Sequence, residues 1–503
     1  MAEPFYITTA ISYPNGPPHI GHAYEAIAAD VIARFQRSQG RDVRFQTGTD
    51  EHGLKMAQAA RSEGVEPREF ADKMSRLFQE MCDTLNVSYD RFIRTSQPDH
   101  YRASQAIWTA MAERGDLYLD RYEGWYSVRD EAYYDEGEVV DGESGEKLSP
   151  QGTPVEWTVE ESWFFRLSKY QQPLLDLYAA NPDFIQPDSR RNEVLRFVEG
   201  GLKDLSISRT SFDWGVPVPG SDNHVMYVWL DALTNYITGL GYPDDTELWR
   251  QYWPANIHLI GKDVVRFHAV YWPAFLMSAG IALPKQVYGH GFLLTRGEKM
   301  SKSVGNVVDP MVLAERFGVD ALRYFLLREV PFGQDGSYSA DAIVNRANAE
   351  LANSFGNLAQ RSLSMIFKNL DGVLPESGSA DADRELLATV EEATKREVPE
   401  AFERLAFSQG IEAWLRAVFA CNQYVDTQAP WALKKSDPER MTAVLGTIVA
   451  AVRELARAIA PITPDSAEKL LAVIAAGEGG APISQPAPLF PRLELDEDEE
   501  AVA

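Results

Sequence analysis

Two short segments carry side chains that suit phosphate chemistry, and the first of them is His19-Ile20-Gly21-His22. It stands where an apolar stretch ends and a helical pattern begins. The start of a helix carries partial positive charge, two imidazoles three residues apart lie on one side of its first turn, and Gly21 leaves room for a nucleotide. We therefore expect a triphosphate site here. Taken alone, the same four residues also fit a surface or core histidine pair, or a metal pair.

The second segment is Lys299-Met300-Ser301-Lys302-Ser303, which follows Thr295-Arg296-Gly297-Glu298 in a stretch too polar to form a core. In isolation it reads as a solvated basic loop. Phosphoryl and nucleotidyl transfer, however, need chiefly alignment and cations where negative charge accumulates, and a loop with two lysines supplies both. Together with the histidines, the segment therefore favours a nucleotide site.

These side chains need a scaffold, and the first 46 residues predict one. Phe5–Ala10 is apolar and β-rich, the turn signal of residues 13–18 follows, and apolar residues from Ile20 recur every three or four positions until Gly40. A second strand is expected at Val43–Gln46. Strand, loop, helix and strand form a βαβ unit, which predicts a doubly wound, Rossmann-type parallel sheet.

The later sequence predicts further parts of the chain. Residues 116–220 are aromatic, β-rich and turn-rich, as in a connective insertion, and the α/β pattern resumes with a helix at Tyr227–Gly239, a strand at Ile257–Ile260 and a helix from Val264 to Ala279. Residues 340–476 are helical in nearly every window, which predicts a helix bundle. The expected domains are 1–115 and 221–285 (the two halves of the catalytic domain), 116–220 (insertion), 286–339 (the basic-segment region), 340–476 (helical domain) and 477–503 (strap and acidic tail).

Composition limits the class of protein. The chain has 503 residues, 45% of them hydrophobic and 24% charged, which is typical of a soluble multidomain protein. No apolar run has transmembrane length and the first residues do not resemble a leader, so we expect a cytoplasmic protein. Cys82 and Cys421 are too few for a disulfide framework and are expected in the core. The net charge of −26 disfavours nucleic-acid binding by overall attraction but permits a local basic face.

The two segments resemble the HIGH and KMSKS signatures of class I aminoacyl-tRNA synthetases, in the order and with the insertion typical of that class. The resemblance to its methionyl branch extends from Phe5 to about Arg492. It is carried further by four strings: Thr47-Gly48-Thr49-Asp50-Glu51-His52-Gly53, Tyr227-Val228-Trp229-Leu230-Asp231-Ala232, Gly261-Lys262-Asp263 with Phe267-His268, and Gln428-Ala429-Pro430-Trp431.

The resemblance implies roles for individual residues. Asp50 would bind the methionine ammonium group, and the rest of the methionine pocket would be Ile11, Tyr13, Trp229, Ala232, Tyr236 and His268. Aromatic groups suit a flexible thioether, and a buried ammonium needs a carboxylate. From the residues alone, core packing is the favoured interpretation of Trp229 and Tyr236, since they are spaced at helical intervals. The ATP site would comprise Gly21, Glu25, Gly261, Asp263, Val264, Ser301 and Ser303, although Asp263 alone also fits a plain turn.

The implied reaction has two steps. The methionine carboxylate attacks the α-phosphate of ATP, bound with Mg²⁺, while His19, His22, Lys299 and Lys302 share the charge that develops on pyrophosphate. The terminal ribose hydroxyl of tRNA(Met), including the initiator tRNA, then takes the methionyl group and releases AMP.

The resemblance also implies an anticodon site in the helical domain, formed by Asn353, Asn357, Arg361 and Trp431. Amides and a guanidinium can hydrogen-bond to splayed bases, and an exposed indole can stack on one. On residues alone, such groups on a helix fit an ordinary solvated surface.

Two departures from the family matter. Many members carry cysteine-bounded zinc knuckles in the insertion, but here the stretch reads Tyr126-Ser127-Val128-Arg129-Asp130-Glu131-Ala132, and no cysteine lies between residues 83 and 420. We therefore expect no structural zinc and no other resident metal. Because the chain also stops soon after Arg492, without the C-terminal dimerisation module of some members, we expect a monomer.

Other classes of protein fit the sequence less well. Synthetases for leucine, isoleucine or valine carry a larger editing insertion, and cysteine enzymes generally bind zinc. A small-molecule nucleotidyltransferase with the HxGH motif would not need a helical C-terminal domain, and a catalytically idle tRNA-binding protein would not need both motifs. An NAD-dependent oxidoreductase is disfavoured because no GxGxxG follows the first strand.

Overall fold

The structure is a computed structural model that describes residues 2–130, 132–142, 145–295, 298–299 and 307–495. It divides into two compact units. The first comprises residues 1–29, 36–83 and 87–290, and the second comprises residues 30–35, 84–86 and 291–503. Among the described residues, no helix has the length and apolar character needed to span a bilayer.

The first unit is built on a six-stranded sheet in the order β3-β2-β1-β13-β14-β9, and every pairing in it is parallel. Its strands are β1 (Pro4–Thr9), β2 (Asp42–Thr49), β3 (Arg91–Arg94), β9 (Ile185–Gln186), β13 (Ile257–Gly261) and β14 (Val287–His290). The order reverses between β1 and β13. Ligands bind at such a switch point, outside the carboxyl ends of the strands.

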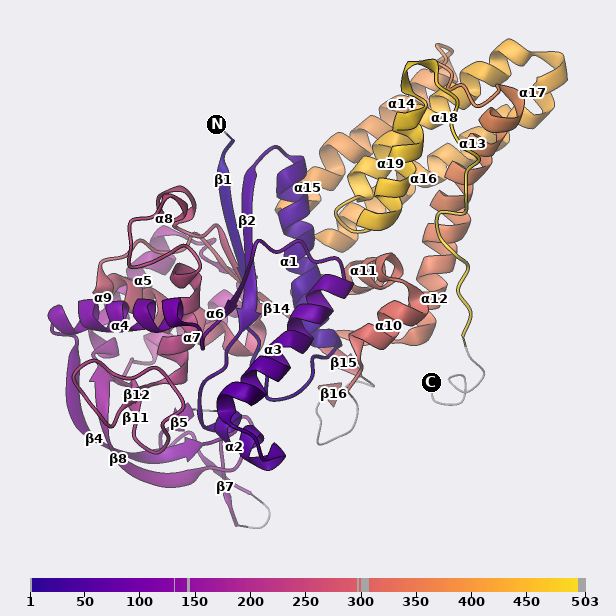
Figure 1. Cartoon of the computed structure of the whole chain (residues 1–503). Helices are drawn as coiled ribbons and strands as arrows, with labels where there is room; N and C mark the ends of the chain where they lie inside the picture. The colour runs from indigo at the N-terminus through magenta and orange to yellow at the C-terminus, as the bar shows by residue number, and fades with distance from the viewer. Residues whose placement is uncertain (1, 131, 143–144, 296–297, 300–306, 496–503) are drawn as a thin grey trace. The chain divides into compact units, whose positions relative to one another are not determined.

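Helices cover both faces of this sheet, as right-handed crossovers require. Figure 1 shows α1 and α3 on one side of β1 and β2, and α4, α7 and α9 on the other. The helices of this unit are α1 (Ile20–Ser38), α2 (Leu54–Glu63), α3 (Pro67–Thr84), α4 (Pro98–Glu113), α5 (Gln171–Ala180), α6 (Asp188–Glu199), α7 (Val228–Thr238), α8 (Glu247–Tyr252) and α9 (Trp272–Ala279). The short helices are η1 (Leu167–Tyr170), η2 (Lys262–Val264) and η3 (Phe267–Tyr271).

The helix expected from Val264 to Ala279 is interrupted. The structure has a 3-10 turn at η2, a π-helix at η3 and an α-helix only from Trp272. Pro273 lies in the first turn of α9, and because proline lacks an N–H it cannot continue a preceding α-helical hydrogen-bond ladder. The interruption places His268 within η3, close to the end of β13.

The insertion between residues 116 and 220 is less uniformly β than its composition predicts. The long strands β4 (Leu117–Ser127) and β8 (Glu156–Phe165) pair antiparallel and are flanked by β5 (Ala132–Tyr134) and β10 (Leu205–Ser206). Short hairpin strands complete it: β6 (Val140–Asp141), β7 (Lys147–Leu148), β11 (Ser208–Arg209) and β12 (Val225–Met226), the last just beyond the insertion. Helices α5 and α6 also arise from it, and its β9 joins the main parallel sheet beside β14.

The second unit is largely helical. It contains a small sheet of β15 (Leu293–Thr295), β16 (Glu298–Lys299) and β17 (Gly336–Tyr338), followed by helices that confirm the bundle expected from residue 340. The helices are α10 (Pro310–Phe317), α11 (Val319–Arg328), α12 (Ala340–Arg346), η4 (Ala347–Gly356), α13 (Asn357–Asn369), α14 (Asp381–Glu392), η5 (Ala393–Glu397), α15 (Val398–Glu403), α16 (Phe407–Gln428), α17 (Pro430–Ser436), α18 (Pro438–Ile459), α19 (Pro464–Ala476) and η6 (Glu478–Gly480).

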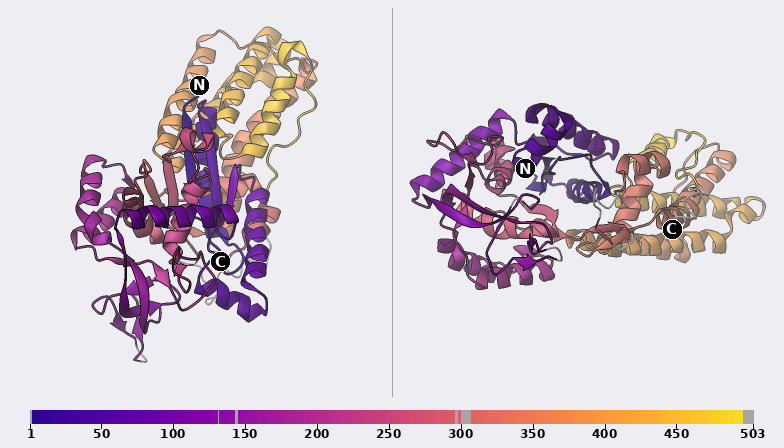
Figure 2. Two further views of the ribbon diagram at one scale, coloured as in Figure 1. Left: turned by 60° about the vertical axis from the view of Figure 1, so that its left-hand side comes forward. Right: turned by 90° about the horizontal axis from the view of Figure 1, so that it is seen from below.

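The long helices α16 and α18 pack against each other in this bundle, whose orange and yellow helices Figure 2 shows from two further sides. Their apolar faces bury Trp414, Leu415, Val418 and the residues of α18 that face them. Cys421 on α16 is buried, as is Cys82 in the first unit, so both cysteines are core residues as expected.

Candidate functional site

The loop from β1 into α1 arranges the two histidines of the HIGH segment. The carbonyl of His19 accepts the first helical bonds, from the N–H groups of His22 and Ala23 at 2.9 and 3.2 Å. The imidazole rings of His19 and His22 stack with centroids 3.8 Å apart. A Cβ atom on Gly21 would lie only 2.9 Å from Cε1 of His19, so glycine leaves space for the ring to fold back over the helix start. The structure therefore gives Gly21 a packing role beside the nucleotide-access role expected for it.

Backbone hydrogen bonds fix which nitrogen of each ring carries the proton. The Gly21 N–H lies 3.1 Å from Nδ1 of His19, and the His19 N–H lies 3.1 Å from Nδ1 of His22. Since an amide N–H can only donate, both Nδ1 atoms accept, and each neutral ring carries its proton on Nε2. Two Nε2–H donors on the first turn of a helix are well suited to bind phosphate oxygens.

Glu25 lies one turn further along α1 and meets the ends of β13 and β14. Nε2 of His290, at the end of β14, lies 2.8 Å from a carboxylate oxygen of Glu25, and the backbone of Gly261 also hydrogen-bonds to that carboxylate. Burial, and the nearby charge of Asp263, raise the pKa of Glu25. The structure thus brings together three residues of the expected ATP site, and Val264 follows them in η2.

Residues expected to bind methionine come from α7 and η3. Trp229 stacks on Phe267 with ring centroids 3.8 Å apart and planes 6° from parallel. Tyr236, two turns along α7, reaches Nε2 of His268 with its hydroxyl at 2.6 Å. Ala232 lies between these two aromatic residues in the sequence of α7 and is buried.

The ring of His268 is held in one tautomer. Its Nδ1 lies 2.9 Å from the carbonyl oxygen of Val264, which can only accept, so Nδ1 carries a proton. Burial lowers the pKa of His268 to about 4. The ring is therefore neutral at pH 7, and its Nε2 accepts the proton of the Tyr236 hydroxyl.

Asp50 follows β2 and is tied to the loop that carries Ile11 and Tyr13. Its N–H donates to the carbonyl of Ser12 at 2.8 Å, and Tyr13 donates its hydroxyl proton to the carbonyl of His52 at 2.8 Å. Asp50 is buried. The pKa of Tyr236 is raised well above its usual value, first by burial and then by the carboxylates of Glu25 and Asp50, so these acids and Tyr236 share one electrostatic environment.

The sequence did not predict a buried cluster around Asp231, next to the residues expected to bind methionine. Asp231 on α7 accepts from Nδ1 of His52 and Nε2 of His100, each at 2.6 Å. Burial alone would raise the pKa of Asp231, but the charges and hydrogen bonds of the two histidines outweigh it and lower that pKa to about 2. The cluster fastens the segment after Asp50 to the helix that carries Trp229 and Tyr236. A charged residue within the apolar pattern of α7 was the one signal for it.

This part of the first unit offers groups suited to activating an amino acid. A buried carboxylate can bind an ammonium group, aromatic rings beside a neutral imidazole can enclose a thioether, and imidazole N–H groups at a helix start can bind phosphates. The two histidines of α1, Asp50 and His268 lie in the segments that follow β1, β2 and β13, around the switch point of the sheet, and α7 adds the aromatic rings.

The basic segment is only partly described. Lys299 belongs to β16, which pairs antiparallel with β15, but its side chain is not described. Ser301, Lys302 and Ser303 lie outside the described residues. Their convergence with the histidines stays a prediction.

The expected anticodon residues lie in the second unit. Asn353, Asn357 and Arg361 occupy successive turns of η4 and α13, and all three are exposed. The guanidinium of Arg361 lies over the ring of Trp431, 5.6 Å from its centroid, and Trp431 is 49% exposed. Arg361 and Trp431 share a groove with Gln360, Ser364 and Met365. The structure therefore joins Arg361 and Trp431 in one surface feature.

The stretch that corresponds to the zinc knuckle forms a hydrogen-bonded cluster. Asp130 accepts from the hydroxyls of Tyr134, Ser149 and Thr153 at 2.9, 2.7 and 2.5 Å, and the hydroxyls of Ser127 and Thr153 lie 2.7 Å apart. Structural zinc is bound by thiolate and imidazole ligands, and hydroxyls around one carboxylate do not supply them. These residues therefore do not fit a zinc ion. Among the residues that the structure describes, no group of three or more His, Cys, Asp and Glu is arranged to hold a metal.

Comparison with protein families gives two matches that together cover most of the chain. Residues 5–363 match the family described as tRNA synthetases class I (M). Residues 374–489 match the anticodon binding domain of methionyl tRNA ligase. The gap between the two matches, residues 364–373, covers the end of α13 and the start of the linker to α14.

Curated relatives and solved structures agree with these matches. The methionine–tRNA ligase of Brucella suis biovar 1 is 58% identical over 98% of this chain and 99% of the relative, and that of Mesorhizobium japonicum is 61% identical over 94% and 92%. The Mycobacterium tuberculosis methionyl-tRNA synthetase in complex with methionyl-adenylate is similar with a TM-score of 0.94 at 56% identity, covering 97% of this chain and 100% of that one.

Proposed function

The chain belongs to the family of class I tRNA synthetases (M), and from that premise we propose how its residues perform the reaction. It acts as a methionine–tRNA ligase: methionine and ATP form methionyl-adenylate and pyrophosphate, and the methionyl group then passes to the 3′ end of tRNA with release of AMP. We propose tRNA(Met), including the initiator tRNA, as the acceptor. We further propose a monomeric cytoplasmic enzyme that uses ATP as its Mg²⁺ complex.

The arrangement around Tyr236 is the single observation that best supports methionine as the substrate. Three side chains here are uncharged: the imidazole of His268, the stacked ring of Trp229 and the hydroxyl of Tyr236. Asp50 adds one carboxylate in the same electrostatic environment. We propose that Asp50 binds the ammonium group. The thioether would contact Ile11, Tyr13, Trp229, Ala232, Tyr236 and His268. A neutral imidazole suits this place because a protonated ring would carry charge against an apolar side chain.

The phosphate end of the site would be formed by the start of α1. We propose that Nε2–H of His19 and His22 donates to the phosphate oxygens of ATP, with Gly21, Glu25, Gly261, Asp263 and Val264 around the nucleoside. The methionine carboxylate attacks the α-phosphorus and pyrophosphate leaves. The negative charge that accumulates on pyrophosphate is stabilised by His19, His22, Lys299 and Lys302, with Ser301 and Ser303 in the same segment.

In the second step the terminal ribose hydroxyl of tRNA attacks the activated carbonyl, and AMP leaves. We propose that Asn353, Asn357, Arg361 and Trp431 select the tRNA by its anticodon. A half-exposed indole beside a guanidinium supports this role, because unpaired bases stack on aromatic rings and hydrogen-bond to arginine.

A pyrophosphate-exchange assay across amino acids tests the proposal. Exchange should depend on methionine, and leucine, isoleucine, valine and cysteine should support it far more weakly. It should proceed with Mg²⁺ and no added zinc. Exchange that depends equally on another amino acid would overturn the substrate assignment, and methionine-dependent exchange without charging of tRNA(Met) would overturn the acceptor assignment.

A further inference from the structure

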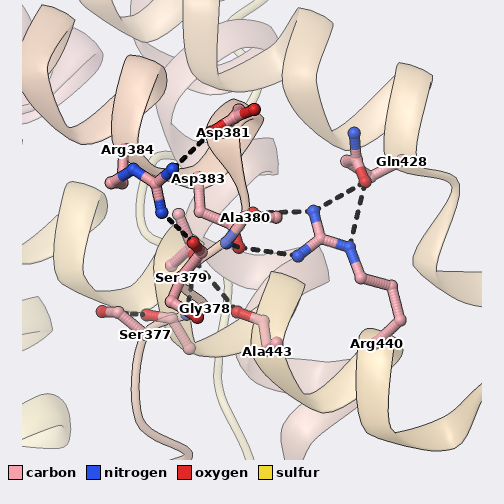
Figure 3. A network of polar contacts seen from close by, with 12 residues as sticks. Ser377, Gly378, Ser379, Ala380, Asp381, Asp383, Arg384, Gln428, Arg440 and Ala443 are labelled. Atoms are coloured by element: carbon pink, nitrogen blue, oxygen red, sulfur yellow. Dashed lines mark hydrogen bonds and ion pairs between the residues drawn. The ribbon is translucent and has the colours of Figure 1, made fainter.

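Beside the corner between α16 and α17 lies a partly buried ion pair that the proposed reaction does not use. Figure 3 shows Arg440, in the first turn of α18, placed between Asp383 of α14 and Gln428. The two ends of the guanidinium meet both oxygens of the Asp383 carboxylate, at 2.6 and 2.7 Å. Asp383 is fully buried. The hydrogen bonds from Arg440 lower the pKa of Asp383 below its usual value, so the pair is ionised at neutral pH.

Gln428 connects this ion pair to the corner. It is the last residue of α16, and its side-chain oxygen accepts from Nη2 and Nε of Arg440 at 2.8 and 3.2 Å. The Tyr424 hydroxyl, one turn earlier on α16, also donates to Asp383. One guanidinium therefore binds α14, the end of α16 and the beginning of α18 together.

The helix between these attachments is α17, which carries Trp431. Pro430 is its one buried residue, and α17 packs chiefly against α18, the helix whose first turn carries Arg440. It starts from Ala429, whose backbone is left-handed with φ 45° and ψ 58°. Such a conformation is unfavourable for a residue other than glycine and persists where the surroundings hold it. Ala429 lies between Gln428, whose side chain Arg440 binds, and the buried Pro430.

We propose that the Asp383–Arg440 pair, acting through Gln428, is a positioning device that presents the Trp431 indole to a tRNA base. The inference rests on the proposed anticodon role of Trp431. Gln428, Arg440 and Asp383 touch no base themselves. They set the direction in which the indole projects, and Arg361 completes the feature from α13.

The variant that isolates this role is Gln428→Met, because it removes the acceptor and leaves the Asp383–Arg440 pair intact. We expect the KM for tRNA(Met) to rise about tenfold, equivalent to about 1.4 kcal/mol and within the range that one base stack contributes. The kcat for charging and the methionine-dependent pyrophosphate exchange should change little. Gln428→Glu restores an acceptor and should restore the KM. Gln423→Met makes the same change at an exposed position of α16 and should have no effect.

A double-mutant cycle with Trp431→Ala completes the test. If Gln428 acts through the indole, Gln428→Met in the Trp431→Ala background adds little to the KM. An additive effect would overturn the inference, as would an unchanged KM in the single variant while Trp431→Ala raises it. Normal charging by Trp431→Ala would instead refute the proposed anticodon role. Thermal unfolding of each variant separates these results from misfolding. If Gln428→Met lowers the rate of pyrophosphate exchange as well as raising the KM for tRNA(Met), the inference is also overturned.

Discussion

The Tyr236 hydroxyl donates to Nε2 of His268 over 2.6 Å, while Nδ1 of the same ring donates to the carbonyl of Val264. One histidine is thereby satisfied on both nitrogens without carrying charge. The consequence is an imidazole that can border an apolar ligand at neutral pH.

Replacing Tyr236 by phenylalanine should weaken methionine binding. The change leaves Nε2 of His268 buried without its donor, and an unsatisfied buried acceptor costs about 1–3 kcal/mol. We expect the KM for methionine in pyrophosphate exchange to rise about tenfold, with a smaller change in the KM for ATP. Tyr170→Phe removes another buried hydroxyl, bonded to Asp116 in the insertion, and serves as the control. An equal rise in both variants would refute the specific role of Tyr236.

The Asp231 cluster predicts a pH dependence of stability. The pKa of Asp231 is about 2 in the folded protein, below its usual value of 3.8, so the stabilisation by its carboxylate is nearly complete above pH 4 and is lost as the pH falls toward 2. The full effect is about 2 kcal/mol, of which about 1 kcal/mol should be lost by pH 3. Chemical denaturation of the parent and of Asp231→Asn between pH 7 and pH 3 measures the contribution of the Asp231 carboxylate to the free energy of unfolding. The difference in unfolding free energy should narrow only below pH 4. A difference that already narrows between pH 7 and 5 would assign the effect to other groups.

Lys302→Ala should slow activation without weakening methionine binding. The lysine is proposed to act when charge develops on pyrophosphate, so its loss raises the barrier more than it affects the bound amino acid. We expect the exchange rate to fall by roughly 10²-fold or more with a nearly constant KM for methionine. Lys285→Ala, at an exposed lysine before β14, provides the control. An unchanged rate of adenylate formation would remove Lys302 from the reaction.

Prolonged chelation should leave methionine-dependent exchange, assayed with Mg²⁺ restored, unchanged. Three hydroxyls donate to Asp130, so hydrogen bonds stabilise the insertion at that place without a zinc ion. Activity that is lost on chelation and returns only with added zinc would contradict the expectation.

Asp130→Asn should lower the melting temperature, because a neutral amide accepts less well from three hydroxyls. Asp222→Asn, at an exposed aspartate, is the control.

Much of the catalytic scaffold could be predicted because its signals are local. The turn after β1, the apolar spacing of α1 and the stop at Gly40 define a βαβ unit within 49 residues, and α1 indeed spans Ile20–Ser38. The parallel sheet and the helical domain follow from similar periodicities. The resemblance then indicated residues for the methionine and ATP sites, several of which the structure brings together near the strand ends.

Long-range pairings could not be predicted in the same way. His52 and His100 meet Asp231 across sequence separations of 179 and 131 residues, and no periodicity encodes such a contact. The π-helix at Phe267–Tyr271 has the apolar texture of an ordinary helix, so its altered hydrogen bonding was also missed. The Asp383–Arg440 pair could not be predicted from the sequence, because arginine and aspartate in helical segments usually lie at the surface.

The pairing of β9 with β14 bears on how this chain could be shortened or transplanted. Residues 185–186 supply the last strand of the parallel sheet, and Phe165, Tyr178 and Phe184 share a core with Trp272 and Phe275. Excision of residues 116–220 would leave the amide and carbonyl groups of β14 open to strands of other molecules and would uncover aromatic surface beside them. A truncated enzyme made this way should aggregate during expression, whereas loss of the β6–β7 hairpin alone should be tolerated.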